Sequence, residues 1–177
     1  MASGEELTFT SFSVELMERQ HDRMKQAVDG LTDEQLWHQP AQETNPIGWL
    51  VWHLSRFKDI QTSRVAAEAE IWISDGWAGR FGLPEERHGN GDTPEQVAAF
   101  RADREFLFGY AEAAHETAVR RVRSATHEQL TRTTPSVLAG RPARQAWQSL
   151  VINASDYAEH TGQIAYLRGM LTGTGWL

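Results

Sequence analysis

Apolar residues recur at alternating steps of three and four positions along four long stretches of this chain. This spacing is typical of helices that bury one face in a core. The sequence contains no convincing strand. The predicted helices cover residues 11–29, 46–72, 93–123 and 142–171, and together they favour an all-α fold, a four-helix bundle.

Helix-start signals support this plan. Thr93 with Gln96 forms a capping box, in which each side chain bonds the backbone of the other residue. Thr32 with Gln35 carries the same signature for a short helix after the first long one. The segment at residues 125–130 repeats that pattern after the third long helix, which suggests two helical hairpins of similar plan.

The connection at residues 73–92 is the longest break in the helical pattern and lies between the second and third long helices. It is rich in glycine and also carries Trp77, Arg80 and Phe81. Loops this long are uncommon unless they are functional or disordered. Two compatible interpretations stay open: a lid over a pocket, or a crossover that packs its aromatic side chains on the end of the bundle.

Composition limits the function classes. The 177 residues are 40% apolar, which suits a single domain spanning residues 1–177. The absence of cysteine excludes disulfides, thiolate nucleophiles and thiolate metal ligands. A formal charge of −7 argues against a nucleic-acid partner, which would need a basic face.

The chain also lacks membrane signals. Its N-terminus has neither the basic start nor the apolar core of a signal peptide. The longest plain apolar run, at residues 47–52, is far too short to cross a bilayer. We therefore expect a soluble cytoplasmic protein with no membrane partner.

The fourth predicted helix carries the best candidate site. Asp156 and His160 are four residues apart, so they point the same way on a helix, about one turn from each other. His53, on the second helix, is the best candidate for a third ligand. Two histidines and one carboxylate would leave coordination positions open for water or substrate.

Other interpretations of these polar residues remain. Arg56 could neutralise a buried Asp156 while His160 is merely hydrogen-bonded, which would give a polar network without chemistry. His21, on the apolar stripe of the first helix, could reach a site in the core, but a hydrogen-bonded core histidine is the favoured interpretation. Spacing alone does not separate the network from a metal site.

Four stretches of the sequence resemble those of a known protein family. The His-x-Gly-Gln pattern at residues 160–163 is the most specific part of them. The chain resembles the DinB-like superfamily of four-helix bundles, which includes the mycothiol- and bacillithiol-dependent enzymes. The resemblance covers residues 12–171. It rests on residues 45–54, 76–84, 93–97 and 160–168.

The resemblance implies a divalent-metal site. In this family a histidine on the second helix and a pair at i, i+4 on the fourth bind the metal, which carries over to His53, Asp156 and His160. The commonest pattern has three histidines, whereas the mycothiol-dependent branch has a carboxylate, usually Glu, at the position of Asp156. The implied metal is zinc, nickel, manganese or iron.

The resemblance also implies a reaction class. A small-molecule thiol, or water, would be activated at the metal and transferred to an electrophile by a thiol transferase, an isomerase or a hydrolase. Arg80 would then contact substrate, Gln163 would either support a metal ligand or bind substrate, and Tyr157 would be a nearby donor. A homodimer with a small-molecule substrate is expected. The alternative is a non-catalytic bundle, with or without metal, that acts in stress response or as a dimeric interaction module.

Overall fold

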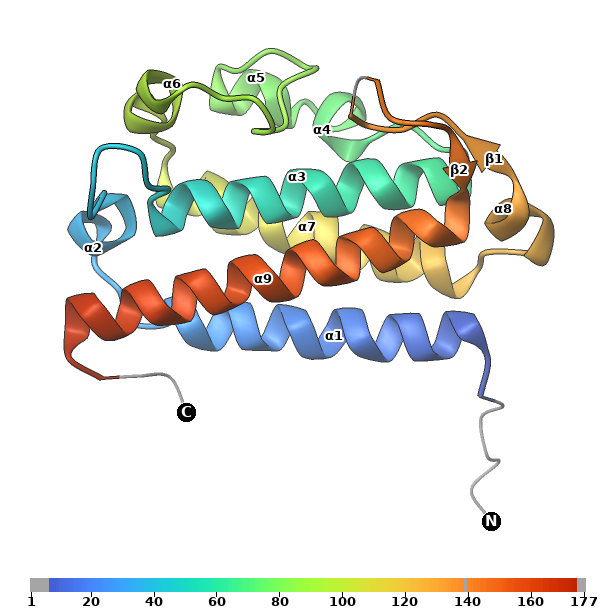
Figure 1. Ribbon diagram of the computed structural model, residues 1–177, viewed down its shortest axis with the longest axis horizontal. Coiled ribbons are helices and arrows are strands. Elements are labelled where there is room, and N and C mark those ends of the chain that lie inside the picture. Colours follow the sequence, from blue (N-terminus) through green and yellow to red (C-terminus); the bar gives the residue numbers. More distant parts are fainter. Residues whose placement is uncertain (1–6, 139, 175–177) are drawn as a thin grey trace.

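The computed structural model describes residues 7–138 and 140–174, and it confirms the expected all-α four-helix bundle (Figure 1). Each long helix packs against two others around a shared core: α3 lies against α7 and α9, and α1 lies against the same two helices. The long helices are α1 (Phe9–Val28), α3 (Ile47–Ala66), α7 (Arg104–Arg123) and α9 (Ala146–Thr172).

Short elements fill the connections. The capping boxes expected at Thr32, Thr93 and Thr126 are all present, and they open three of the short helices. Two strands of two residues each pair antiparallel, with Thr133 opposite Gln145, and this small hairpin was not expected from the sequence. The short elements are α2 (Asp33–Trp37), α4 (Ile71–Ser74), α5 (Trp77–Phe81), α6 (Pro94–Ala99), α8 (His127–Thr131), β1 (Thr133–Thr134) and β2 (Arg144–Gln145).

Three predicted helix boundaries were wrong. The second long helix ends at Ala66, because Ala67 adopts a left-handed conformation with φ of 59° and closes the helix on the Ser63 carbonyl. The predicted helix 93–123 is two helices, because the chain leaves α6 at Phe100 and starts α7 only after Asp103. The Asp103 carboxylate caps α7 by accepting the Glu105 N–H. The fourth long helix starts at Ala146, after β2.

The central helix is α3, which is buried along almost its whole length. Its apolar side chains on several faces meet α7, α9 and the segments that follow α3. Trp52 contacts both Trp72 and Phe100, with ring centroids 6.2 and 4.8 Å away. A helix surrounded in this way holds its side chains in fixed positions, which matters for His53 at its middle.

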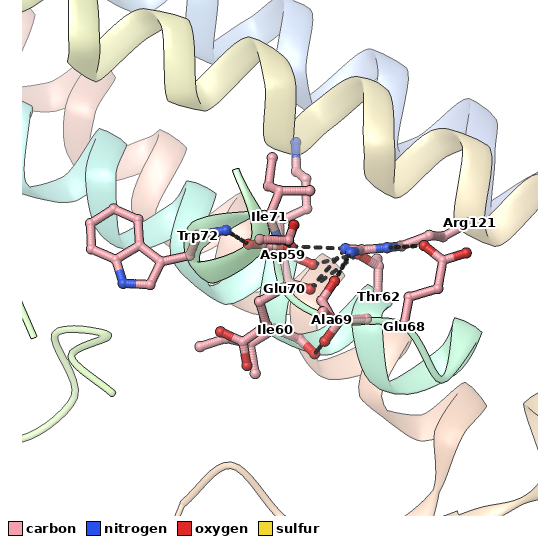
Figure 2. A network of polar contacts seen from close by, with 12 residues as sticks. Asp59, Ile60, Thr62, Glu68, Ala69, Glu70, Ile71, Trp72 and Arg121 are labelled. Atoms are coloured by element: carbon pink, nitrogen blue, oxygen red, sulfur yellow. Dashed lines mark hydrogen bonds and ion pairs between the residues drawn. The ribbon is translucent and has the colours of Figure 1, made fainter. Parts of the chain in front are cut away.

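A buried ionic network fastens the chain just after α3 (Figure 2). The Asp59 carboxylate is fully buried and accepts the backbone N–H groups of Ile71 and Trp72 at 3.2 and 3.0 Å. Arg121 of α7 donates to the same carboxylate at 2.8 Å. Because Asp59 holds the start of α4 and Arg121 holds Asp59, the beginning of the 73–92 connection is tied to both α3 and α7.

The aromatic residues of that connection pack onto the bundle. Phe81 lies 5.2 Å from Trp72 and 5.9 Å from Tyr110 between ring centroids, and Trp77 lies 5.5 Å from Tyr110. This is the crossover arrangement that the sequence left open beside a lid. Within residues 7–138 and 140–174, no helix has the length and apolar character needed to span a membrane.

Candidate metal centre

The three residues chosen from the sequence meet where α3 and α9 lie side by side. His53 Nε2 is 4.0 Å from Asp156 Oδ2, and His160 Nε2 is 3.5 Å from Asp156 Oδ1. One ligand atom from each residue lies within 4.8 Å of the other two. Among the described residues, no other group of three or more histidine, cysteine and acidic side chains converges in this way.

The Nδ1 atom of each histidine ring lies within hydrogen-bond distance of an oxygen acceptor. His53 Nδ1 lies 2.6 Å from the backbone carbonyl of His88, and His160 Nδ1 lies 2.8 Å from Gln163 Oε1. A carbonyl or amide oxygen can only accept, so each Nδ1 carries the proton. When each ring is neutral, its Nε2 atom then carries the lone pair and faces Asp156, as in metal-binding imidazoles.

Asp156 supplies an independent sign of a missing partner. Its Oδ2 atom is buried, and within the part of the chain that the structure describes it accepts no hydrogen bond. A buried carboxylate oxygen without a donor or a cation costs free energy. A divalent cation between the three side chains would satisfy it.

The spacing fits a small divalent ion. Tetrahedral zinc with bonds of about 2.0–2.2 Å places neighbouring ligand atoms about 3.4 Å apart. The observed separations are 3.5 Å to Oδ1 and 4.0 Å to Oδ2, and the three ligand atoms lie within 4.8 Å of one another, so the side chains would close in slightly around a bound ion. Two imidazoles and one carboxylate suit zinc, nickel, manganese or ferrous iron, so the donor set fits the metals that the sequence suggested.

Burial and charge act on the two histidines in opposite directions. Burial lowers the pKa of His53 below its usual value, although the Asp156 carboxylate opposes this shift. Burial also lowers the pKa of His160, but the contacts with Asp156 and Gln163 outweigh it, and the net pKa is raised. His53 is therefore neutral at neutral pH, which is the form that binds metal.

The other sequence candidates lie in different places. Gln163 is at the site, bonded to His160. Arg80 stacks over the Trp77 ring at 4.4 Å, and no described contact joins it to the triad. Tyr157 is buried on another side of α9, where its hydroxyl lies 3.3 Å from His21 Nδ1. The structure thus brings Gln163, but neither Arg80 nor Tyr157, to the triad.

The alternative role for Arg56 was wrong. Its guanidinium pairs with Glu70 at 2.9 Å and lies 3.6 Å from Asp59, and no described contact joins it to Asp156. It also donates to the Tyr110 hydroxyl at 3.3 Å. No described arginine or lysine pairs with Asp156, and its described neighbours among the titratable groups are His53 and His160.

A second group of histidines and carboxylates, which we call the α1–α7 cluster, lies across the bundle. His21 and His115 stack with ring centroids 3.9 Å apart. His21 Nε2 contacts Glu112 at 3.2 Å, and His115 Nε2 contacts Glu18 at 2.9 Å. The cluster consists of Glu18, His21, Lys58, Glu112, His115 and Tyr157.

The interior of the cluster is also paired. His21 Nδ1 faces the Tyr157 hydroxyl, and His115 Nδ1 lies 3.3 Å from the ammonium of Lys58. The preferred interpretation of His21 as a hydrogen-bonded core histidine is thereby confirmed. Sequence reasoning missed Lys58 and His115. The repeated Glu-x-x-His spacing at residues 18–21 and 112–115 is the signal that could have found the pairing.

Comparisons with known proteins agree with this picture. The sequence profile described as the DinB superfamily matches residues 16–164. The fold is similar to the crystal structure of a conserved protein from Enterococcus faecalis, with a TM-score of 0.82 and 26% sequence identity. That alignment covers 96% of this chain and 100% of the other. No curated protein sequence gives a significant match.

Proposed function

Because this chain belongs to the DinB superfamily, we propose that it is a divalent-metal enzyme that activates a small-molecule thiol, or water, for transfer to an electrophile. The observation that carries the proposal is the convergence of His53, Asp156 and His160 around the buried Asp156 Oδ2, which accepts no hydrogen bond among the described residues. Three protein ligands leave coordination open for a reactant. A purely structural site would close its coordination with a fourth side chain.

Each residue of the triad has a distinct task. His53 is almost fully buried, with 3% of its side chain exposed, and forms the fixed inner ligand. Asp156 and His160, with 24% and 18% exposed, form the side of the site that a reactant can reach. Gln163 is exposed beside His160, so its amide nitrogen is free to contact a substrate while its oxygen holds the imidazole.

The chemistry follows from the donor set. A divalent ion held by these side chains would supply the Lewis acidity that lowers the pKa of a thiol or a water molecule. The chain has no cysteine, so any thiol must come from a small molecule. With one Asp156 oxygen on the ion, its second oxygen would receive the proton that such a nucleophile loses.

The test is a reaction screen with defined metals. Metal-depleted protein is reloaded with zinc, nickel, manganese or ferrous iron and mixed with low-molecular-weight thiols, or with none, and a panel of soluble electrophiles. We expect turnover that needs metal and is lost in Asp156→Asn, with an unchanged helical circular dichroism spectrum. Turnover that survives in Asp156→Asn, or no turnover with any metal, would overturn the enzyme proposal and favour a non-catalytic bundle.

A further inference from the structure

One piece of the 73–92 connection lies directly on His53. The segment from Arg87 to Asp92, which we call the clasp segment, presents the His88 carbonyl to His53 Nδ1 at 2.6 Å. Gly89 follows with a positive φ of 92°. A Cβ atom on Gly89 would stand 2.7 Å from His53 Nδ1 and 2.8 Å from the Trp49 ring. The backbone can approach His53 this closely only because residue 89 is glycine.

The clasp segment is closed by an ion pair between its two ends. Arg87 Nε donates to Asp92 Oδ1 at 3.2 Å, and Arg87 Nη2 donates to Asp92 Oδ2 at 2.8 Å. This is the two-pronged arrangement that makes arginine–carboxylate pairs directional. The Arg87 and Asp92 side chains are only 17% and 7% exposed, so water screens the pair weakly.

The closed segment is anchored to α3 at two further points. Trp49 Nε1 donates to Asp92 Oδ2 at 3.1 Å. Arg56 Nε donates to the Arg87 carbonyl at 3.1 Å. Trp49 and Arg56 lie one turn before and one turn after His53 on α3, so the segment is fixed on both sides of the imidazole that it contacts.

We propose that the Arg87–Asp92 pair is a positioning device that holds His53 in one tautomer, with the proton on Nδ1 and the Nε2 lone pair directed at Asp156 and His160. The metal-binding consequence rests on the proposed function, whereas the tautomer is a property of the metal-free protein. A neutral imidazole can carry its proton on either nitrogen, and the hydrogen bond made by one nitrogen decides which. Without the pair, the His88 carbonyl loses its fixed place.

The two histidine ligands differ in how they are held. The partner of His160 is the side chain of Gln163, which is exposed and rotates freely when it leaves the bond. The partner of His53 is a backbone carbonyl inside a segment closed by buried charges. His53 is therefore the ligand whose geometry is set before metal arrives, and disturbing the segment should affect metal affinity without touching any ligand.

The experiment reads the His53 tautomer directly. Protein labelled with ¹⁵N-histidine and stripped of metal is studied by long-range proton–nitrogen NMR, and the His53 signals are identified by their loss in His53→Gln. We expect wild type to show His53 protonated on Nδ1 only. In Arg87→Gln, which removes the ion pair, we expect the signals of both tautomers.

Arg101→Gln is the matched control. Arg101 donates to the carbonyls of Ala98, in α6, and of Phe100, just after it, and makes no described contact with the clasp segment. Its substitution should leave the His53 tautomer and the zinc affinity unchanged. If Arg87→Gln fails to fold by circular dichroism, Asp92→Asn removes the charge from the same pair and keeps an acceptor for Trp49.

Zinc titration gives the second readout. The loss of a group that orients a histidine ligand typically costs about 10–100-fold in metal affinity, and we expect that loss in Arg87→Gln. A single unchanged His53 tautomer and unchanged zinc affinity in the folded variants would overturn the positioning role. If the tautomer shifts but wild type binds no metal, the positioning role stands and the proposed metal function fails.

Discussion

The triad between α3 and α9 and the α1–α7 cluster both combine histidines with carboxylates on antiparallel helix pairs. The two regions differ in whether their imidazole nitrogens and carboxylate oxygens have hydrogen-bond partners. In the α1–α7 cluster, every imidazole nitrogen of His21 and His115 has a partner at 2.9–3.3 Å. In the triad, each imidazole has a close hydrogen bond at Nδ1, and its Nε2 lies 3.5 Å (His160) or 4.0 Å (His53) from an oxygen of Asp156. A buried carboxylate oxygen of Asp156 is left without a hydrogen bond among the described residues.

The difference lies in what faces the histidines. The α1–α7 cluster contains a lysine and a tyrosine that donate to the imidazoles, and its carboxylates accept from them. No described lysine, arginine or tyrosine contacts the triad, and its three ligand atoms lie within 4.8 Å of one another. Helical spacing brings histidines and carboxylates together in both regions, but only unpartnered acceptors that converge make a metal site.

We expect the largest effect on zinc affinity, which should depend on the triad and not on the α1–α7 cluster. Replacing a ligand in His53→Ala or His160→Ala should weaken zinc binding by more than about 100-fold, beyond the usual cost of losing an orienting group. His21→Gln, the matched change in the α1–α7 cluster, should alter zinc binding by less than about twofold. Isothermal titration calorimetry measures both. A similar loss in His21→Gln would remove the distinction.

The next effect concerns Lys58, the buried cation of the α1–α7 cluster. Burial lowers its pKa to about 7, although Glu112 and Glu18 oppose the shift. Between pH 7 and 10.5 the unfolded chain therefore binds more protons than the folded one, and the free energy of unfolding rises with pH in that window. Lys58→Met should remove this rise, and chemical denaturation at pH 6.5, 7.5 and 9 measures it.

Lys25→Met is the control for that experiment. Lys25 is half-exposed and also pairs with Glu112, at 3.2 Å. The substitution Lys25→Met therefore removes a neighbouring cation but not a buried one. The pH dependence between 6.5 and 9 should remain in this variant. A steep rise that persists in Lys58→Met would mean that another group controls the stability of the α1–α7 cluster.

Acidification should act on the same cluster through His21. Burial, with help from Lys58 and His115, lowers the pKa of His21 from 6.5 to about 3. The unfolded chain thus binds more protons between those two values, so the free energy of unfolding falls as pH is lowered from 6.5 toward 3. His21→Gln should show a shallower fall than wild type when urea denaturation is compared at pH 6.5 and 4.5.

The smallest effect concerns Asp156 in the absence of metal. Asp156→Asn replaces a carboxylate whose buried Oδ2 accepts no described hydrogen bond by an amide that can donate to a histidine lone pair. The free energy of unfolding of the metal-free protein should stay level or rise by up to about 1 kcal/mol. Thermal denaturation in a chelator tests this, and a clear loss of stability would show that Asp156 already has a satisfied structural place.

Part of this arrangement was predictable from the sequence. Helical periodicity together with the family resemblance pointed to His53, Asp156 and His160, because helices fix the direction of side chains four residues apart. The break between α6 and α7 was not predictable in the same way. Phe100 and Leu107 are seven residues apart, the spacing of one helix face, and both are buried in the same core although the helix is broken between them, so the pattern hides the break.

The groups that orient the histidine ligands were harder to predict from the sequence. The His88 carbonyl that holds His53 is a backbone atom, and its position depends on how Arg87, Gly89 and Asp92 fold against α3. The burial of Lys58 was hidden for another reason. A helix that is covered on all sides, as α3 is, no longer has a polar face that would mark a lysine as exposed.

Zinc content tests the metal centre at the triad most directly. Metal-depleted protein is incubated with zinc, the excess is removed, and the bound zinc is measured by elemental analysis in wild type, Asp156→Asn and His21→Gln. We predict a single bound ion per chain in wild type and in His21→Gln, and none in Asp156→Asn. Zinc that stays bound in Asp156→Asn, or wild type that retains none, would contradict a metal centre at the triad.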